Sequence, residues 1–239
     1  MSKYGVFITS AANAKFSKYS PAERVEQTLK TVESVRKYIP NAFICMTDCS
    51  VPGVDQATQD ALSADVDVFV NLSKDPNVNW IQNNIQHQDT VKNLTELVVV
   101  SKFFKLATEK KWFDDTDRIF KVSGRYWLTE NFDITRYEQA DAKGKYVVSK
   151  KLLSQFPKDY VGQSLQHMLR VYSLDTTLMY DFATRLSIMT NHMQERVNAG
   201  GYIDIEHLFC KFLPKDLTLE IARTGVAGNI APNGQFIEN

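Results

Sequence analysis

The N-terminal half of the chain alternates between short continuous apolar runs and longer stretches in which apolar residues recur at helical spacing. The continuous runs Tyr4–Ser10, Ala42–Thr47 and Asp67–Leu72 are rich in β-branched and aromatic residues. Runs of this length and composition are typical of buried β-strands. We therefore predict three strands here, each followed by small or polar residues.

The stretch between the first two runs predicts an amphipathic helix. Its start is marked by Ser20-Pro21-Ala22-Glu23, in which a serine N-cap, a proline in the first turn and a glutamate three residues on form a capping box. Pro40 ends the helix. The apolar residues at helical spacing in between are Val25, Leu29, Val32, Val35 and Ile39. We expect this apolar face to pack on a sheet.

Further along, a short helix is predicted over Val54–Leu62 and a long helix from about Leu94 to Lys111, after a polar, asparagine-rich stretch around Asn77–Gln88. A fourth strand, Arg118–Ser123, follows. Strands that alternate with amphipathic helices indicate parallel pairing through right-handed crossovers. We predict an α/β fold with a single doubly wound, mostly parallel sheet and helices on both faces.

The C-terminal half has a less regular pattern. The predicted elements are strands near Lys145–Ser149 and Arg170–Leu174 and helices near Leu178–Asn198 and Asp204–Phe212. The tail Gly225–Gly234 is rich in turn-forming residues and is expected to be an ordered surface loop. No linker-like stretch divides the chain, so we predict one domain.

Composition and charge narrow the classes of function. Lys plus Arg number 28, as do Asp plus Glu, so the formal net charge is zero and no global field attracts nucleic acid. No apolar run approaches the roughly 18 residues of a membrane span, and the N-terminus lacks the apolar segment of a secretory signal. Cys45, Cys49 and Cys210 form no C-x-x-C pair, which argues against a disulfide framework or a structural zinc. We expect a cytoplasmic protein without a nucleic-acid partner or a membrane span.

The fourth predicted strand carries the most informative polar residues. In open α/β sheets ligands bind beyond the carboxyl ends of the strands, and alternation places Lys121, Ser123 and Arg125 on one face there. A lysine in a buried strand must be paired or reach a charged ligand, and an arginine can donate two charge-assisted hydrogen bonds to a phosphate. We therefore hypothesise a phosphate or diphosphate site. The alternative is an edge strand in which Lys121 pairs with an acidic neighbour such as Asp117 and Arg125 caps a loop.

Three other positions near predicted strand ends or in the long helix are candidates for ligand contacts. Thr9 and Ser10 end the first strand and Asp48 follows the second, where side chains can contact a nucleoside, although an aspartate here is also an ordinary turn former. Lys102 lies within the long predicted helix and is interpreted first as a solvent-facing residue. Its second interpretation is a diphosphate contact.

Asp204-Ile205-Glu206-His207 begins a predicted helix and brings two carboxylates together. Asp204 suits an N-cap with Glu206 in the first turn. The functional alternative is a carboxylate general base at the cleft, with His207 orienting it or contacting an anion. The histidines are too far apart in sequence to form a zinc set, and no nucleophile elbow, P-loop or Rossmann glycine motif is present.

Four segments resemble the nucleotide-sugar glycosyltransferases of the GT-A type, over roughly Tyr4 to Tyr126. They are VFITSAAN, FICMTDCS, LTELVVVSKFFKLA and RIFKVSGRYWL. In that family one strand ends in small residues at the nucleotide, the next ends in an acidic residue at the base, and a long helix precedes a strand that ends in a metal-binding D-x-D. The segments KVSGRYWLTENFD, DIEHLF and GVAGNIAPNG are also similar to segments of small viral and bacterial glycosyltransferases that decorate capsids or surface polysaccharides.

The resemblance implies an enzyme that transfers a sugar from a nucleoside-diphosphate sugar, such as a UDP-sugar, to a hydroxyl of a glycan or glycoconjugate. Residues 1–126 would form a nucleotide-binding half and residues 127–239 an acceptor and catalytic half, with the tail closing over the donor. It implies inverting chemistry with Glu206 as base and Asp204 as second choice, and a contact from His207 to the acceptor or an anion. The residues expected at the donor are Thr9, Ser10 and Asp48 for the nucleoside and Lys102, Lys121, Ser123 and Arg125 for the diphosphate.

The sequence departs from this family at the metal site, because Ser123-Gly124-Arg125 stands where D-x-D is expected. No cofactor is therefore assigned, and dependence on Mn²⁺ or Mg²⁺ is left open. Lys121 and Arg125 could neutralise the leaving diphosphate instead. Two other functions stay open: a nucleotidyltransferase of similar sheet order, which needs carboxylate-held Mg²⁺, and a carbohydrate- or nucleotide-binding module without turnover.

Overall fold

The computed structural model describes residues 3–230 and 234–238, and its central feature is a seven-stranded sheet in the order β10-β6-β9-β4-β1-β2-β3. Its strands are β1 Tyr4–Ser10, β2 Phe43–Asp48, β3 Val68–Asn71, β4 Arg118–Ser123, β6 Tyr146–Ser149, β9 Val171–Asp175 and β10 Thr218–Ile221. The pairs β1–β2, β2–β3, β1–β4 and β6–β10 are parallel, whereas β9 is antiparallel to both β4 and β6. The predicted mostly parallel α/β sheet is confirmed.

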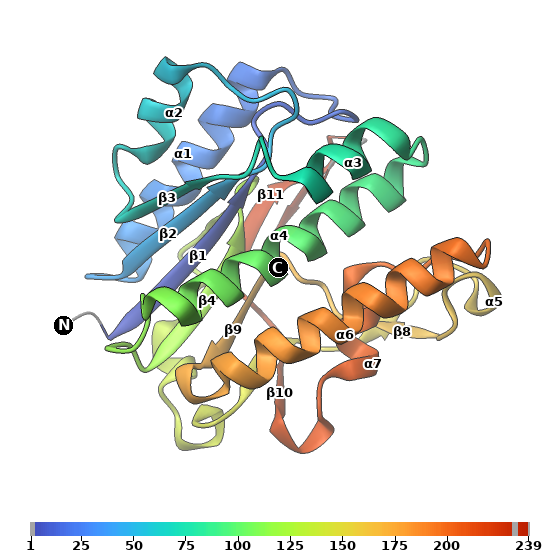
Figure 1. The fold of residues 1–239 in the computed structure, drawn as a ribbon. Helices are drawn as coiled ribbons and strands as arrows, with labels where there is room; N and C mark the ends of the chain where they lie inside the picture. The colour runs from blue at the N-terminus through green and yellow to red at the C-terminus, as the bar shows by residue number, and fades with distance from the viewer. Residues whose placement is uncertain (1–2, 231–233, 239) are drawn as a thin grey trace.

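Helices cover both faces of this sheet. They are α1 Pro21–Tyr38, α2 Gln56–Ser63, α3 Pro76–Asn84, α4 Gln88–Lys110, α5 Lys158–Val161, α6 Met179–Asn198 and α7 Ile205–Phe212. Four 3₁₀ helices span Ile134–Tyr137, Ala140–Ala142, Thr176–Leu178 and Lys215–Leu217 within the described ranges. In Figure 1, α1 and α2 lie on one face, and α4 and α6 run side by side across the other.

Two smaller sheets flank the large one. The first contains β5 Tyr126–Leu128, β11 Val226–Asn229 and β12 Phe236–Glu238, and the second pairs β7 Leu152–Leu153 with β8 Leu165–Gln166. Part of the predicted tail loop is therefore a strand, because β11 lies within it. This strand pairs antiparallel with β12 on one side and with β5 on the other. The part of the tail at 231–233 lies outside the described residues.

Alternation along the strands divides the core between the two faces. Phe7 and Ile119 point toward α4, where the ring of Phe7 stacks on Phe103 with centroids 3.6 Å apart. Val6 and Phe120 point the other way, toward α1. Both clusters are buried, so the sheet is covered on each side, as the continuous apolar runs predicted.

The sequence signals at the start of α1 act as expected. The backbone N–H of Glu23 donates to Ser20 Oγ at 3.3 Å, and the Ser20 N–H donates to Glu23 Oε2 at 2.7 Å. This capping box satisfies backbone donors that the first turn leaves unpaired. Thr28 and Thr31 are on the buried face of the helix and donate to backbone oxygens of Gly124 and Tyr126. The helix therefore holds the β4–β5 turn in place.

The asparagine-rich stretch was not expected to be helical, yet it forms α3 and the first turn of α4. Asp75 caps α3 by accepting from the N–H groups of Asn77 and Val78, and Pro76 occupies the first helical position. Only Val78 and Ile81 are buried, so the polar residues around them conceal the helical period.

Among the described residues, no helix is both long and apolar enough to cross a bilayer.

Candidate functional site

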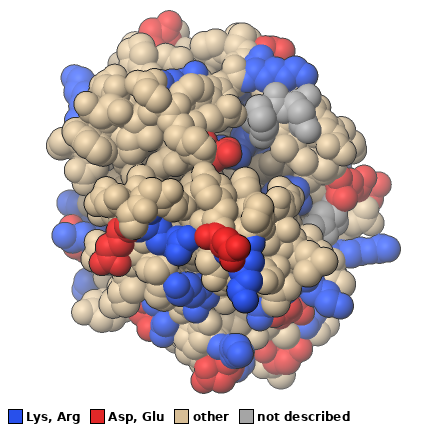
Figure 2. All heavy atoms as spheres, turned by 90° about the vertical axis from the view of Figure 1, so that its right-hand side faces the viewer, with Lys and Arg blue, Asp and Glu red and all other residues tan. Residues whose placement is uncertain are grey.

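Two adjoining cavities open at the carboxyl ends of the parallel strands. The first is lined mainly by the loop after β1 and by α4, and the second by α4, the start of α7 and the segment before β9. Residues that line both are Lys92, Glu96, Ser123 and Arg125. The face in Figure 2 is hollowed near its centre, and atoms of acidic and basic side chains are visible in the hollow.

Arg125 is held at this shared wall by the turn that precedes it. The Gly124 N–H donates to the Thr9 carbonyl at 2.8 Å, and a Cβ on Gly124 would lie only 2.8 Å from that oxygen, so a side chain does not fit. The guanidinium of Arg125 lies over the ring of Tyr126. Its Nη1 is shielded from solvent and has no hydrogen-bond acceptor in the part of the chain that the structure describes. A buried cationic donor without a partner is suited to an anionic ligand.

Lys121 points to the same side of the sheet but is already paired. Its Nζ donates to the carboxylate of Glu96 and to Ser123 Oγ at 2.7 Å, and its side chain is 1% exposed. The predicted need for a partner is met, but by Glu96 of α4 and not by Asp117. Lys121 lines neither cavity, so its contribution there is through the position and charge of Glu96.

The first cavity has a strongly basic wall. Arg24 of α1 lines it and donates from Nε to the Ala11 carbonyl at 2.6 Å. Burial, and then the charge of nearby Arg125, lower the pKa of Arg24 to about 10. Two guanidinium groups thus repel one another here, and an anion between them would relieve that repulsion.

The expected nucleoside contacts are only partly brought together. Thr9 and Ser10 line the first cavity. Asp48 is 1% exposed and lines neither cavity, because its two oxygens accept from the N–H groups of Ala12 and Ser50, both at 3.0 Å. Asp48 is therefore a turn former and not a nucleoside contact. It ties the loop after β1 to the loop after β2.

Lys102 lies away from the cavities. Its Nζ forms an ion pair with Asp75 Oδ2 at 2.6 Å, and its side chain is 36% exposed. This pair connects α4 to the cap of α3 and leaves Lys102 outside both cavity linings. The first interpretation of Lys102, a residue that faces solvent, agrees with this position.

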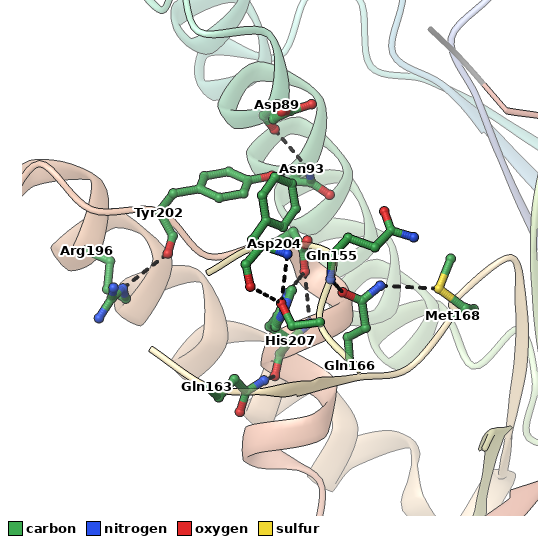
Figure 3. A network of polar contacts seen from close by, with 12 residues as sticks. Asp89, Asn93, Gln155, Gln163, Gln166, Met168, Arg196, Tyr202, Asp204 and His207 are labelled. Carbon is green, nitrogen blue, oxygen red and sulfur yellow. Dashed lines mark hydrogen bonds and ion pairs between the residues drawn. The ribbon is translucent and has the colours of Figure 1, made fainter. Parts of the chain in front are cut away.

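The start of α7 is fixed by a chain of three polar side chains. Asp204 Oδ1 accepts from the His207 N–H at 2.9 Å and contacts His207 Nδ1 at 2.5 Å, and His207 Nε2 contacts Ser154 Oγ at 2.8 Å. Figure 3 shows Asp204 and His207 in contact at the start of α7, with Tyr202 reaching Asn93 of α4. His207 is fully buried and lines neither cavity, whereas Asp204 borders the second one.

Four carboxylate residues line the second cavity, namely Asp89, Glu96, Asp204 and Glu206, and Glu206 is the one whose pKa is raised. Within the described ranges its side chain accepts no hydrogen bond. Burial, and then the negative charge of Asp204, raise its pKa from 4.5 to about 7. A carboxylate with this pKa can accept a proton near neutral pH, which is what a general base requires.

Sequence reasoning missed several charged cavity residues, among them Lys92 and Arg170 in addition to Arg24 and Glu96. Lys92 is exposed in the second turn of α4, and Arg170 lies immediately before β9 with its guanidinium over Tyr126. In a parallel sheet the residues that follow the strands meet the ligand edge. Because β9 runs antiparallel to β4, its first residue, not its last, meets the ligand edge. That direction has no local signal in the sequence.

The described residues contain no group of three or more His, Cys, Asp or Glu side chains that could hold a metal ion. At the end of β4, where a D-x-D would stand, the side chains are Ser123 and Arg125. The nearest carboxylate on that wall, Glu96, is used by Lys121. The side chains at the end of β4 therefore do not fit a divalent ion, which needs several free oxygen ligands.

Comparison with solved structures identifies the fold. Core-mannan synthase A (CmsA/Ktr4) from Aspergillus fumigatus, in its Mn/GDP form, superposes with a TM-score of 0.57 at 11% identity, over 97% of this chain and 75% of that one. The galactosyltransferase LgtC, in complex with donor and acceptor sugar analogues, gives 0.57 at 11% identity over 90% and 72%. Neither a protein-family model nor a curated protein sequence matches the chain. The topology and these superpositions together show that the chain has the GT-A glycosyltransferase fold.

Proposed function

We propose that the protein is a glycosyltransferase, a hexosyl- or pentosyltransferase that moves a sugar from a nucleoside-diphosphate sugar to a hydroxyl of a glycan or glycoconjugate. One observation supports this above all. Two cavities share a basic wall at Arg125, and the second cavity is lined by Glu206, a carboxylate whose pKa is raised to about 7.

The division of the site follows from its chemistry. The nucleoside binds in the first cavity against the loop that contains Thr9 and Ser10, and the diphosphate lies at the shared wall. The sugar then projects into the second cavity, where the acceptor hydroxyl meets Glu206. Arg125 stabilises the negative charge that grows on the diphosphate as it leaves.

The transfer is a single displacement in this proposal. The acceptor oxygen forms a bond to the anomeric carbon while the bond from that carbon to the diphosphate breaks, and the nucleoside diphosphate leaves. The acceptor proton moves to Glu206. Attack from the face opposite the leaving group inverts the configuration at the anomeric carbon. A positioned base of this kind contributes roughly a hundred- to ten-thousand-fold in rate.

A thermal-shift screen followed by a transfer assay tests the proposal. UDP-, GDP-, dTDP- and CMP-sugars are compared, and a ligand at a hundred times its dissociation constant stabilises by about 2.7 kcal/mol. With the donor that binds, Glu206→Gln is expected to bind it normally and to lose transfer. The matched control is Glu195→Gln, because Glu195 is exposed on α6 and lines neither cavity.

The outcomes separate the alternatives. Product formation that is lost in Glu206→Gln and kept in Glu195→Gln supports the proposal. Donor binding without hydrolysis or transfer under any acceptor condition indicates a binding module. Nucleotidyl transfer from a nucleoside triphosphate indicates a nucleotidyltransferase, and failure of every nucleotide to stabilise the protein rejects the donor site.

A further inference from the structure

Two arginines from different elements stack on one aromatic ring at the wall of the second cavity. Arg125 follows β4 and Arg170 precedes β9, and their guanidinium carbons lie 5.4 Å and 5.7 Å from the centroid of the Tyr126 ring. The Ser123 N–H donates to the Arg170 carbonyl at 3.1 Å, which fixes the two segments side by side. Both side chains line the second cavity.

Neither guanidinium forms an ion pair with a described residue, although the charge of Arg125 acts on Glu96 and that of Arg170 acts on Glu206. Among residues 3–230 and 234–238, the side chains of Arg125 and Arg170 form no hydrogen bond or ion pair. The carboxylate on this wall, Glu96, is held by Lys121, and Asp204 is held by His207. The protein therefore holds two cationic forks at the cavity and leaves their donors unused.

One structural neighbour was solved as an Mn/GDP form, whereas the corresponding wall in this protein carries two arginines. The carboxylates near the cavities are poor metal ligands for specific reasons. Glu96 is paired with Lys121, Asp204 is paired with His207, and Glu206 favours its neutral form below a pH of about 7. The described residues form no group of three or more His, Cys, Asp or Glu side chains that could hold a metal ion. A divalent ion needs several free oxygen ligands, and this wall offers guanidinium donors in their place.

We propose that Arg125 and Arg170 together bind the two phosphates of the donor and supply the positive charge that a divalent cation would otherwise supply. The inference rests on the proposed function and deepens it. Two planar forks carry two positive charges and can each make paired hydrogen bonds to phosphate oxygens. The contact of both guanidinium groups with the Tyr126 ring restricts them before the donor arrives, which reduces the side-chain entropy lost on binding.

Binding measurements with a nucleoside and its diphosphate test the inference, using the nucleotide that stabilises the protein in the screen. Titration calorimetry is run in excess EDTA and again in excess Mn²⁺, on the unmodified protein and on Arg170→Gln. We expect equal diphosphate affinity in EDTA and in Mn²⁺. Arg170→Gln is expected to weaken the diphosphate by about ten-fold or more and to leave the nucleoside unchanged.

Two further variants distinguish the loss of a phosphate contact from a disturbance of the cavity by the substitution itself. Arg170→Lys keeps the charge and the aliphatic stem and is expected to recover part of the lost affinity. Arg223→Gln changes an exposed arginine that lines neither cavity and is expected to bind like the unmodified protein. A loss of nucleoside binding in Arg170→Gln would instead show that the variant disturbs the cavity, and would contradict a role confined to the phosphates.

The failures are distinguishable. Diphosphate binding that disappears in EDTA and returns with Mn²⁺ overturns this inference and leaves the glycosyltransferase proposal standing. Diphosphate affinity unchanged in Arg170→Gln also overturns it. Absence of binding by every nucleoside diphosphate and sugar, in either condition, overturns both proposals together.

Discussion

Lys121 of β4 donates to the carboxylate of Glu96 on α4 at the wall between the two cavities, and its ammonium is almost completely buried while the carboxylate is 24% exposed. Burial by itself would raise the pKa of Glu96, but the charge of Lys121 and its hydrogen bond lower it overall. The carboxylate of Glu96 therefore stays ionised beside the cationic wall, although the pair as a whole is neutral. The two partners are unequal, since only one of them can still reach water.

That inequality predicts different costs for removing each partner. Glu96→Gln leaves a buried ammonium with the neutral Ser123 Oγ as an acceptor and no carboxylate partner, and it is expected to lower the free energy of unfolding by about 3–5 kcal/mol. Lys121→Met leaves a partly exposed carboxylate and is expected to cost less. Urea denaturation at neutral pH measures both. Equal costs in the two variants would contradict the asymmetry, and the double variant Glu96→Leu with Lys121→Met should recover much of the loss.

Glu206 is predicted to lower stability as the pH rises. Its pKa is about 7 in the folded protein and 4.5 in an ordinary environment, so between these values the unfolded chain loses a proton that the folded chain keeps. The stabilisation from the neutral carboxyl is complete below pH 4.5 and lost as the pH passes 7. Glu206→Gln, which cannot ionise, should gain relative stability across this window, by up to about 3 kcal/mol at pH 8.

Thermal unfolding of both proteins at a series of pH values checks this. The difference in unfolding free energy between Glu206→Gln and the unmodified protein should grow from pH 4.5 to pH 8 and then level off. A constant difference over that range would show that the carboxyl of Glu206 is not shifted. The variant is expected to be more stable and inactive at once, which separates loss of chemistry from loss of fold.

Asp204 is predicted to tune the pH dependence of transfer through Glu206. Its charge is the second cause of the raised pKa of Glu206, after burial. Asp204→Asn keeps an oxygen to cap α7 but removes that charge, so the acidic limb of the profile of kcat/KM against pH should move down by roughly one unit or less. Ser154→Ala removes the far end of the polar chain and keeps the charge, and it should leave the limb in place. An upward shift in Asp204→Asn would refute this role.

Gly124→Ala is predicted to displace Arg125. The added Cβ would lie 2.8 Å from the Thr9 carbonyl oxygen, a backbone atom that cannot rotate away. We expect a loss of about 1–3 kcal/mol in stability and weaker binding of nucleoside diphosphates. Gly200→Ala is the control, because its added Cβ meets nothing within 4 Å and only its positive φ is strained. That control should lose about 1 kcal/mol and bind nucleotides normally; calorimetry on both variants decides.

Patterns of a few neighbouring residues were enough to predict several elements of the fold. The capping box at Ser20, the buried strands and the face shared by Lys121 and Ser123 all follow from spacing within a few residues, and the structure has each of them. The position of Glu206 in the first turn of α7 was likewise visible, because an N-cap aspartate marks a helix start locally.

Which side chains are free to contact a ligand depends on contacts between segments that are far apart in the sequence. Glu96 is distant in sequence from the lysine it neutralises, and Asp48 is consumed by the N–H groups of Ala12 and Ser50, contacts that no local pattern encodes. Arg170 reaches the cavity because β9 runs against its neighbours. Strand direction and the choice of ion-pair partner are set by packing between distant segments. Local sequence patterns therefore do not predict them.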